Sequence, residues 1–95
     1  MAYGRGHGVV VVASAGNSAI DLDNDSPTLL SIPAQINGVV SVAATGPFNQ
    51  TDFDALASYS DFGKKSVTIG APGGDFISGN GLDYVIGACS EYSLV

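Results

Sequence analysis

The sequence predicts an α/β domain built on a mainly parallel sheet, rich in strands and loops and poor in helices. Two runs of small and β-branched apolar residues, 9–13 and 39–44, lack the regular polar alternation of a half-exposed strand. Such runs are typical of strands buried on both faces of a parallel sheet. Thirteen glycines and four prolines in 95 residues indicate short elements joined by tight turns. Apolar residues do not recur at helical spacing over any long window.

The first predicted strand, 9–13, follows a short glycine-rich stretch and runs directly into five small residues, 14–18. Small residues let the backbone turn and let a ligand approach closely. The other elements follow in order: an irregular polar loop over 19–31, a second strand over 39–44, a loop over 45–56, a short strand over 57–62, a third apolar strand over 67–70 and a last strand at 84–86.

The scarcity of helices has a consequence for how the predicted sheet is covered. Parallel strands are joined by crossovers of about a dozen residues, usually helices, and these helices cover the faces of the sheet. Without such helices we expect the faces of this sheet to be bare. The composition therefore predicts a piece of a larger α/β domain, or an oligomer whose partner covers the sheet.

Composition and charge exclude several classes of function. Three basic residues and a net charge of −6 argue against nucleic acid, since phosphate binding needs clustered Lys and Arg. The longest apolar run has five residues, far short of the roughly 18 needed to cross a membrane. No secretory signal is expected at the N-terminus, because no apolar stretch precedes a small-residue cleavage site there. Cys89 is the sole cysteine, and we interpret it as a buried bystander thiol.

The most suggestive chemistry lies at the end of the first strand, in the segment Ser14–Asn17. Parallel sheets place ligands at the carboxyl ends of their strands. An asparagine there can present its side-chain amide to a developing oxyanion. It can equally serve only the turn, because asparagine tolerates left-handed backbone conformations. The local sequence favours the turn.

Two other features of the sequence are candidate sites. Asp21, Asp23 and Asp25 have the alternate spacing of calcium-loop ligands. The residues after Asp25 depart from the calcium-loop pattern. The sequence therefore favours a solvated acidic loop, and a calcium-stabilised loop is the weaker hypothesis. His7 is the only histidine, and nothing near it has the features of a nucleophile elbow.

The order of four segments resembles the subtilisin-like serine proteases (subtilases). The strand that ends in Ala15-Gly16-Asn17 is similar to the family's V-V-V-A-A-A-G-N motif. The next segment, Ile32-Pro33-Ala34 together with 39–44, matches the family's Y-P-A and V-I-S-V-A-A motifs. Residues 57–63 then match an A-S-F-S-N-x-G motif, and residues 67–74 match a V-D-x-x-A-P-G motif. Each match is weak alone, but the four in sequence cover about two thirds of the chain.

The resemblance implies a fold, a reaction and a set of residues. It implies part of a three-layer subtilisin-like fold, with residues 1–95 forming a peptidase domain incomplete at both ends. Asn17 matches the oxyanion-hole asparagine, and Ser14, Ala15 and Gly16 match the strand beside the pocket for the residue that precedes the scissile bond. The implied partner is a peptide or protein substrate. Some members of the family bind calcium, and an extracellular location is implied for the parent enzyme.

The family's catalytic Asp, His and Ser lie in D-T-G, H-G-T and G-T-S-M-A motifs, and none of these motifs occurs in the 95 residues. His7 directly precedes the first strand, and Ser90 and Ser93 lack the flanking residues of the nucleophile motif. We therefore expect a fragment that carries the oxyanion donor and is inactive alone. The alternative is a non-catalytic remnant that forms a homo-oligomer or binds a partner.

Overall fold

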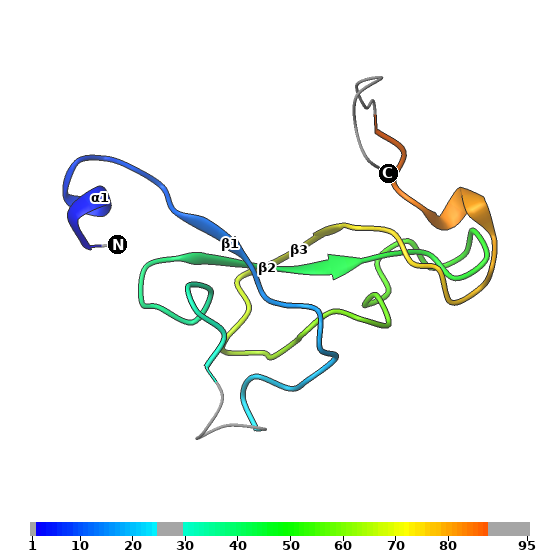
Figure 1. Cartoon of the computed structure of the whole chain (residues 1–95), viewed down its shortest axis with the longest axis horizontal. Coiled ribbons are helices and arrows are strands. Elements are labelled where there is room, and N and C mark those ends of the chain that lie inside the picture. The colour runs from blue at the N-terminus through cyan, green and yellow to red at the C-terminus, as the bar shows by residue number, and fades with distance from the viewer. Residues whose placement is uncertain (1, 25–29, 88–95) are drawn as a thin grey trace, which may run out of the picture.

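The computed structural model describes residues 2–24 and 30–87, and Figure 1 shows their arrangement. Three parallel strands form one sheet in the order β1-β2-β3. The elements are α1 (Ala2–Gly6), β1 (Val12–Ser14), β2 (Val40–Thr45), β3 (Ile69–Pro72) and the 3-10 helix η1 (Gly81–Asp83). The predicted fold class is confirmed: a parallel sheet with few helices.

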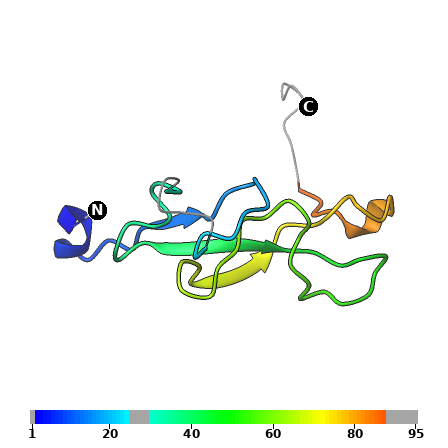
Figure 2. The same cartoon turned by 90° about the horizontal axis from the view of Figure 1, so that it is seen from below.

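The register places the carboxyl ends of all three strands at one edge of the sheet. Val12 pairs with Val40, and Val42 pairs with both Ser14 and Ile69. The long connections after β1 and β2 return the chain to the opposite edge before the next strand begins. Figure 2 shows the strands as one twisted layer, with α1 beyond one end and η1 beyond the other.

Burial differs sharply between the two faces of the sheet. On one face Ala43 of β2 packs with Ala15 and Leu22 in a small core, flanked by Ile20 and Val67. These apolar residues come from loops, so the chain's own loops cover this face, contrary to the expectation of two bare faces. The opposite face is open, since Val12 of β1 is 61% exposed and Ile69 of β3, which is level with Ser14, is 52% exposed.

Two predicted strands are absent from the described residues. Within 57–62 only Phe62 forms a bridge, to Asp21, because the backbone groups of this stretch bond to different segments. The Ala57 N–H donates to Ala44 C=O, whereas the Asp61 N–H donates to Gly16 C=O. Residues 84–86 lie beside no strand and follow η1 without regular structure.

The observed boundaries of two strands also differ from the predicted ones. The first strand begins at Val12 and not at Val9, because only from Val11 onward does the chain bond to β2. The third strand begins at Ile69 and not at Val67. The first backbone bond from this segment to β2 is donated by the Thr68 N–H to Ser41 C=O, directly before the first paired residue, Ile69. The interpretations of Asp25 and Cys89, and of Ser90 and Ser93, lie outside the described residues. Within 2–24 and 30–87, no helix reaches the length and apolar character needed to cross a membrane.

Candidate functional site

Asn17 lies just past the carboxyl end of β1, in an exposed bend. Its position follows from pairing: the Ala15 N–H donates to Val42 C=O at 2.8 Å, which extends the β1–β2 ladder one residue beyond the strand. The chain then turns away from the sheet at Gly16. The asparagine side chain is thus placed at the edge where parallel sheets hold ligands.

Asp61 holds this bend from a segment 44 positions away in the chain. Its carboxylate Oδ1 accepts the Ser18 N–H at 2.7 Å and the Ile20 N–H at 3.2 Å. Its own N–H donates to Gly16 C=O at 2.9 Å. Asp61 is only 4% exposed. The residues on both sides of Asn17 are therefore tied to one buried residue, Gly16 through the Asp61 backbone N–H and Ser18 through the Asp61 carboxylate.

Gly16 is required where the chain passes Asp61. Its φ of 128° lies in a region that residues with a side chain rarely adopt. A Cβ at Gly16 would stand 3.0 Å from Asp61 Cγ and closer still to Oδ2. The glycine thus lets the carboxylate approach the backbone beside Asn17.

A hollow of about 350 Å³ opens beside this bend, lined by Gly16, Ser18, Ile20, Leu30, Ser31 and Asp61. Ser31 joins the hollow to β1, because its Oγ donates to Ala15 C=O at 2.6 Å. The following Ile32–Pro33 bond is cis. The structure thus brings the predicted Ile32-Pro33-Ala34 segment next to the predicted Ala15-Gly16-Asn17 segment.

The predicted substrate-lining residues occupy three different settings. Gly16 lines the hollow, whereas the exposed Ser14 borders a separate shallow groove of about 350 Å³ across the open face of the sheet. Ala15 turns its side chain into the core, so it presents only backbone groups to the site. Asp61 and Ser31 were not singled out from the sequence. The spacing of Asp61 from Asn17 gives no local signal, since their contact arises only in the folded chain.

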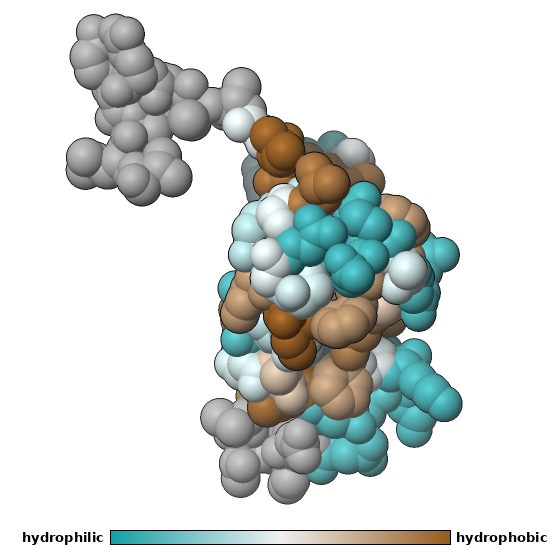
Figure 3. All heavy atoms as spheres, turned by 90° about the vertical axis from the view of Figure 1, so that its right-hand side faces the viewer, coloured by the Kyte–Doolittle hydropathy of each residue, from teal (hydrophilic) through white to brown (hydrophobic). Residues whose placement is uncertain are grey.

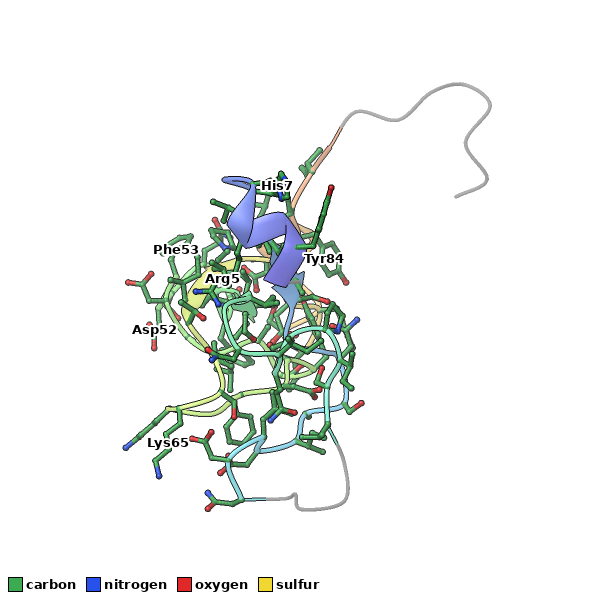
Figure 4. The ribbon with its side chains drawn as sticks, turned by 90° about the vertical axis from the view of Figure 1, so that its left-hand side faces the viewer. Arg5, His7, Asp52, Phe53, Lys65 and Tyr84 are labelled. Atoms are coloured by element: carbon green, nitrogen blue, oxygen red, sulfur yellow. The ribbon has the colours of Figure 1, made fainter. Side chains whose placement is uncertain are left out.

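His7 and the acidic loop lie elsewhere. His7 directly follows α1, on the amino side of β1, where its ring lies 4.3 Å from the Tyr3 ring in a tilted arrangement and its Nδ1 lies 2.8 Å from Tyr3 C=O. Figure 4 shows it beside α1, away from Lys65. The Asp23 carboxylate accepts the N–H groups of Lys65 and Ser66 at 2.9 Å. Hydrogen bonds from Lys65 and Ser66 lower the pKa of Asp23, against the opposing effect of burial.

The Asp21 carboxylate accepts hydrogen bonds from the Asp23 N–H at 3.0 Å and from the Asn24 side chain at 2.7 Å. The described residues contain no group of three or more His, Cys, Asp or Glu side chains placed to hold a metal ion.

Two further buried carboxylates fix the loops beyond β2 and β3. Asp75 accepts the N–H and Oγ–H of Ser58 and the N–H of Phe76. Burial raises the pKa of Asp75, but these hydrogen bonds more than offset it and the pKa is lowered. Burial likewise raises the pKa of Asp83, and hydrogen bonds from Gln50, Ser78 and Asn49 outweigh it, lowering the pKa to about 2.

The three-stranded parallel sheet with few helices defines an α/β protein, and several solved structures share this fold. The epidermin leader peptide processing serine protease of Staphylococcus aureus is 29% identical, with a TM-score of 0.65 over 80% of this chain and 20% of that one. A lanthipeptide protease is 31% identical, with a TM-score of 0.64 over 77% and 21%. The nisin leader peptidase of Lactococcus lactis, at 18% identity and a TM-score of 0.65 over 79% and 23%, shares the fold.

The sequence profile of the subtilase family, peptidase family S8, matches residues 1–92. The chain therefore belongs to the subtilase family. It spans about a fifth of the length of the similar solved proteases. A comparison with curated protein sequences finds no significant match.

Proposed function

We propose that this chain supplies the oxyanion-hole segment of a subtilisin-like serine endopeptidase. In this role the Asn17 side-chain N–H donates to the negatively charged oxygen of the tetrahedral intermediate. The observation that carries the proposal is the Asn17 bend itself: an exposed amide at the carboxyl edge of the sheet, with its neighbours bonded to the buried Asp61. A donor held in place before the reaction needs no reorganisation when charge develops.

The surrounding residues suit a peptide substrate. Gly16 and the hollow beside it leave room for the side chain that precedes the scissile bond. Ser14 and Ala15 complete the short strand along which an extended substrate is proposed to lie. Two of the similar solved proteases are named for the processing of leader peptides. We extend to this chain only the class of substrate, a peptide.

Peptide-bond hydrolysis needs a nucleophile and a base in addition to the oxyanion donor. The family motifs for these groups do not occur in the 95 residues. We therefore propose that hydrolysis depends on polypeptide outside these residues and that the 95-residue chain alone is inactive. Oxyanion stabilisation without the triad leaves only a small remainder of catalysis.

The test begins with the DNA on both sides of the reading frame. In-frame D-T-G and H-G-T motifs upstream and a G-T-S-M-A motif downstream are expected, and the whole product is then assayed on a chromogenic peptide. Asn17→Ala is expected to lower kcat by about 10²–10³-fold with little change in KM, because the donor acts in the transition state. Asn37→Ala is the matched control, since Asn37 is also exposed but lies before β2.

Two results would contradict this proposal. An unchanged kcat in Asn17→Ala would remove the oxyanion role. Hydrolysis by the repurified 95-residue chain that vanishes in Asn17→Ala would show that the chain is active without the missing motifs.

The open face of the sheet favours a second candidate function, a non-catalytic module that self-associates or binds a partner. Val12 and Ile69 lie on this face and are more than half exposed. Exposed apolar surface of this kind marks interfaces. Stop codons flanking the reading frame and a stable oligomer in light scattering would support this function. A well-folded monomer would count against it.

A further inference from the structure

Two loops beyond the carboxyl ends of β2 and β3 form a single unit, here called the loop pair: residues 46–56 and 74–85. Asp83, only 1% exposed, joins them. Its carboxylate accepts the N–H groups of Asn49 at 2.7 Å and Gln50 at 2.8 Å, and the hydroxyl of Ser78. Gln50 Nε2 also donates to Leu82 C=O at 2.8 Å. These bonds fix the two loops against each other.

The first loop holds an uncommon concentration of backbone strain. Asn49, Gln50 and Asp52 all adopt left-handed conformations, with φ of 50°, 59° and 48°. Non-glycine residues in this region are costly and persist only where the surroundings enforce them, often at ligand sites. Here the buried Asp83 enforces the first two. The fold thus holds this loop in a single shape at a cost in stability.

The loop pair turns apolar side chains outward. Phe48 is 57% exposed, Phe53 60% and Leu82 69%. Between the loops lies a hollow of about 200 Å³ lined in part by Pro47, Phe53, Leu82 and Tyr84, the size of one large side chain. Figure 3 shows hydrophobic and hydrophilic side chains interleaved on this end of the molecule.

All charged side chains of the loop pair are acidic. Asp52 and Asp54 are exposed, and neither 46–56 nor 74–85 contains a Lys, Arg or His. Figure 4 shows Asp52 and Phe53 together at one margin of the molecule, with Lys65 well below them. Asp52 and Asp54 flank Phe53 in the chain, and Phe53 lines the hollow, so this surface is complementary to a chain that alternates cationic and apolar side chains. A second copy of this chain, with a net charge of −6, is a poor match.

We propose that the loop pair is an exosite that binds an extended cationic segment of the peptide substrate. One apolar side chain of that segment enters the hollow, and its Lys or Arg residues face Asp52 and Asp54. The inference rests on the proposed peptidase function, and it adds a contact away from the Asn17 bend: in Figure 1 the chain after β1 turns away from the loops beyond β2.

The test measures binding to the 95-residue chain by fluorescence anisotropy. The probe is a short fluorescein-labelled peptide with lysines around one leucine in a Gly/Ser background, and its partner probe carries glutamate for each lysine. We expect the lysine probe to bind at least about tenfold more tightly at low salt and to lose most of this advantage at about 0.5 M salt.

Two sets of variants locate the site. Phe53→Ser is expected to weaken binding of the lysine probe by about fivefold or more, because an exposed aromatic anchor is lost. Asp52→Lys with Asp54→Lys is expected to weaken it by about tenfold at low salt. Tyr3→Ser removes an aromatic residue that is also exposed, on α1, and is expected to change nothing. Circular dichroism checks that each variant is folded.

The proposal is overturned if the two probes bind equally, if neither produces an anisotropy change, or if Tyr3→Ser weakens binding as much as Phe53→Ser. Self-association that is lost in Phe53→Ser would overturn it in favour of a second copy as the occupant. Because the assay needs no hydrolysis, it is independent of the oxyanion role. Asn17→Ala is expected to bind the lysine probe normally.

Discussion

Replacement of Gly16 by alanine tests whether Asp61 packs against the bend as described. The new Cβ would fall against the Asp61 carboxylate, in a backbone conformation with φ of 128°. An alanine forced into such a region costs about 1–3 kcal/mol. Displacement of the carboxylate loses at least one of its two charged hydrogen bonds, each worth about 1.5–3 kcal/mol.

These effects together give an expected loss of about 2.5–6 kcal/mol in the free energy of unfolding. A domain of this length has a total of roughly 5–14 kcal/mol, so Gly16→Ala removes a large fraction of the stability and leaves the chain barely folded at the lower end of that range. Urea unfolding followed by circular dichroism measures the loss. Gly6→Ala is the matched control: nothing lies within 4 Å of its added Cβ, and in α1 alanine is expected to stabilise by up to about 1 kcal/mol.

A double-mutant cycle with Asp61→Ala isolates the clash from the backbone strain. Without the carboxylate, the alanine at Gly16 pays only the strain, so the double variant is expected to lose about 1–3 kcal/mol less than the two single losses combined. Single losses that add within about 0.5 kcal/mol would refute the contact between Gly16 and Asp61.

The other predictions concern acid stability, a buried hydroxyl and the open face. The pKa of Asp83 is lowered from 3.8 to about 2, so the stabilising effect of its carboxylate is complete above about pH 5 and is lost as the pH falls from about 4 to 2. Urea unfolding midpoints measured across this pH range check the prediction. Asp83→Asn is expected to reduce the pH dependence of the midpoint. Ser41→Ala is expected to be neutral or to stabilise by up to about 1 kcal/mol in thermal unfolding, because the buried Ser41 Oγ has no partner within the described part of the chain. Val12→Ser is expected to change the free energy of unfolding by less than about 0.5 kcal/mol, because the Val12 side chain is mostly exposed. A large loss of stability, or a change in the mass measured by light scattering, would indicate that a second copy covers this face.

The sheet was predictable because its signal is local. The runs at 9–13 and 39–44 contain most of β1 and β2, and the third predicted strand, 67–70, overlaps β3 only at Ile69 and Gly70. Composition cannot state which side of an isolated sheet its loops cover. That depends on Ile20 and Leu22, which pack against the core around Ala43 from a stretch whose sequence predicts only a polar loop.

The position of Asn17 after a strand was predictable, but the device that holds it was not. Asp61 lies in the stretch 57–62, which was predicted as a short strand, and its bonds to Ser18 and Ile20 join segments more than 40 residues apart. The bonds of Asp83 to Gln50 likewise join segments 33 residues apart. Local patterns predict strands and turns, whereas these carboxylates act through long-range contacts that no local pattern contains.

The strand register also sets the order in which this chain is able to fold. Val12 finds its partner only at Val40, and Val42 finds its second partner only at Ile69, so each strand pairing closes a loop of more than two dozen residues. Loop closure of this kind precedes any gain from the contacts and slows folding. During synthesis the pairing of β1 with β2 cannot form until the second strand has left the ribosome.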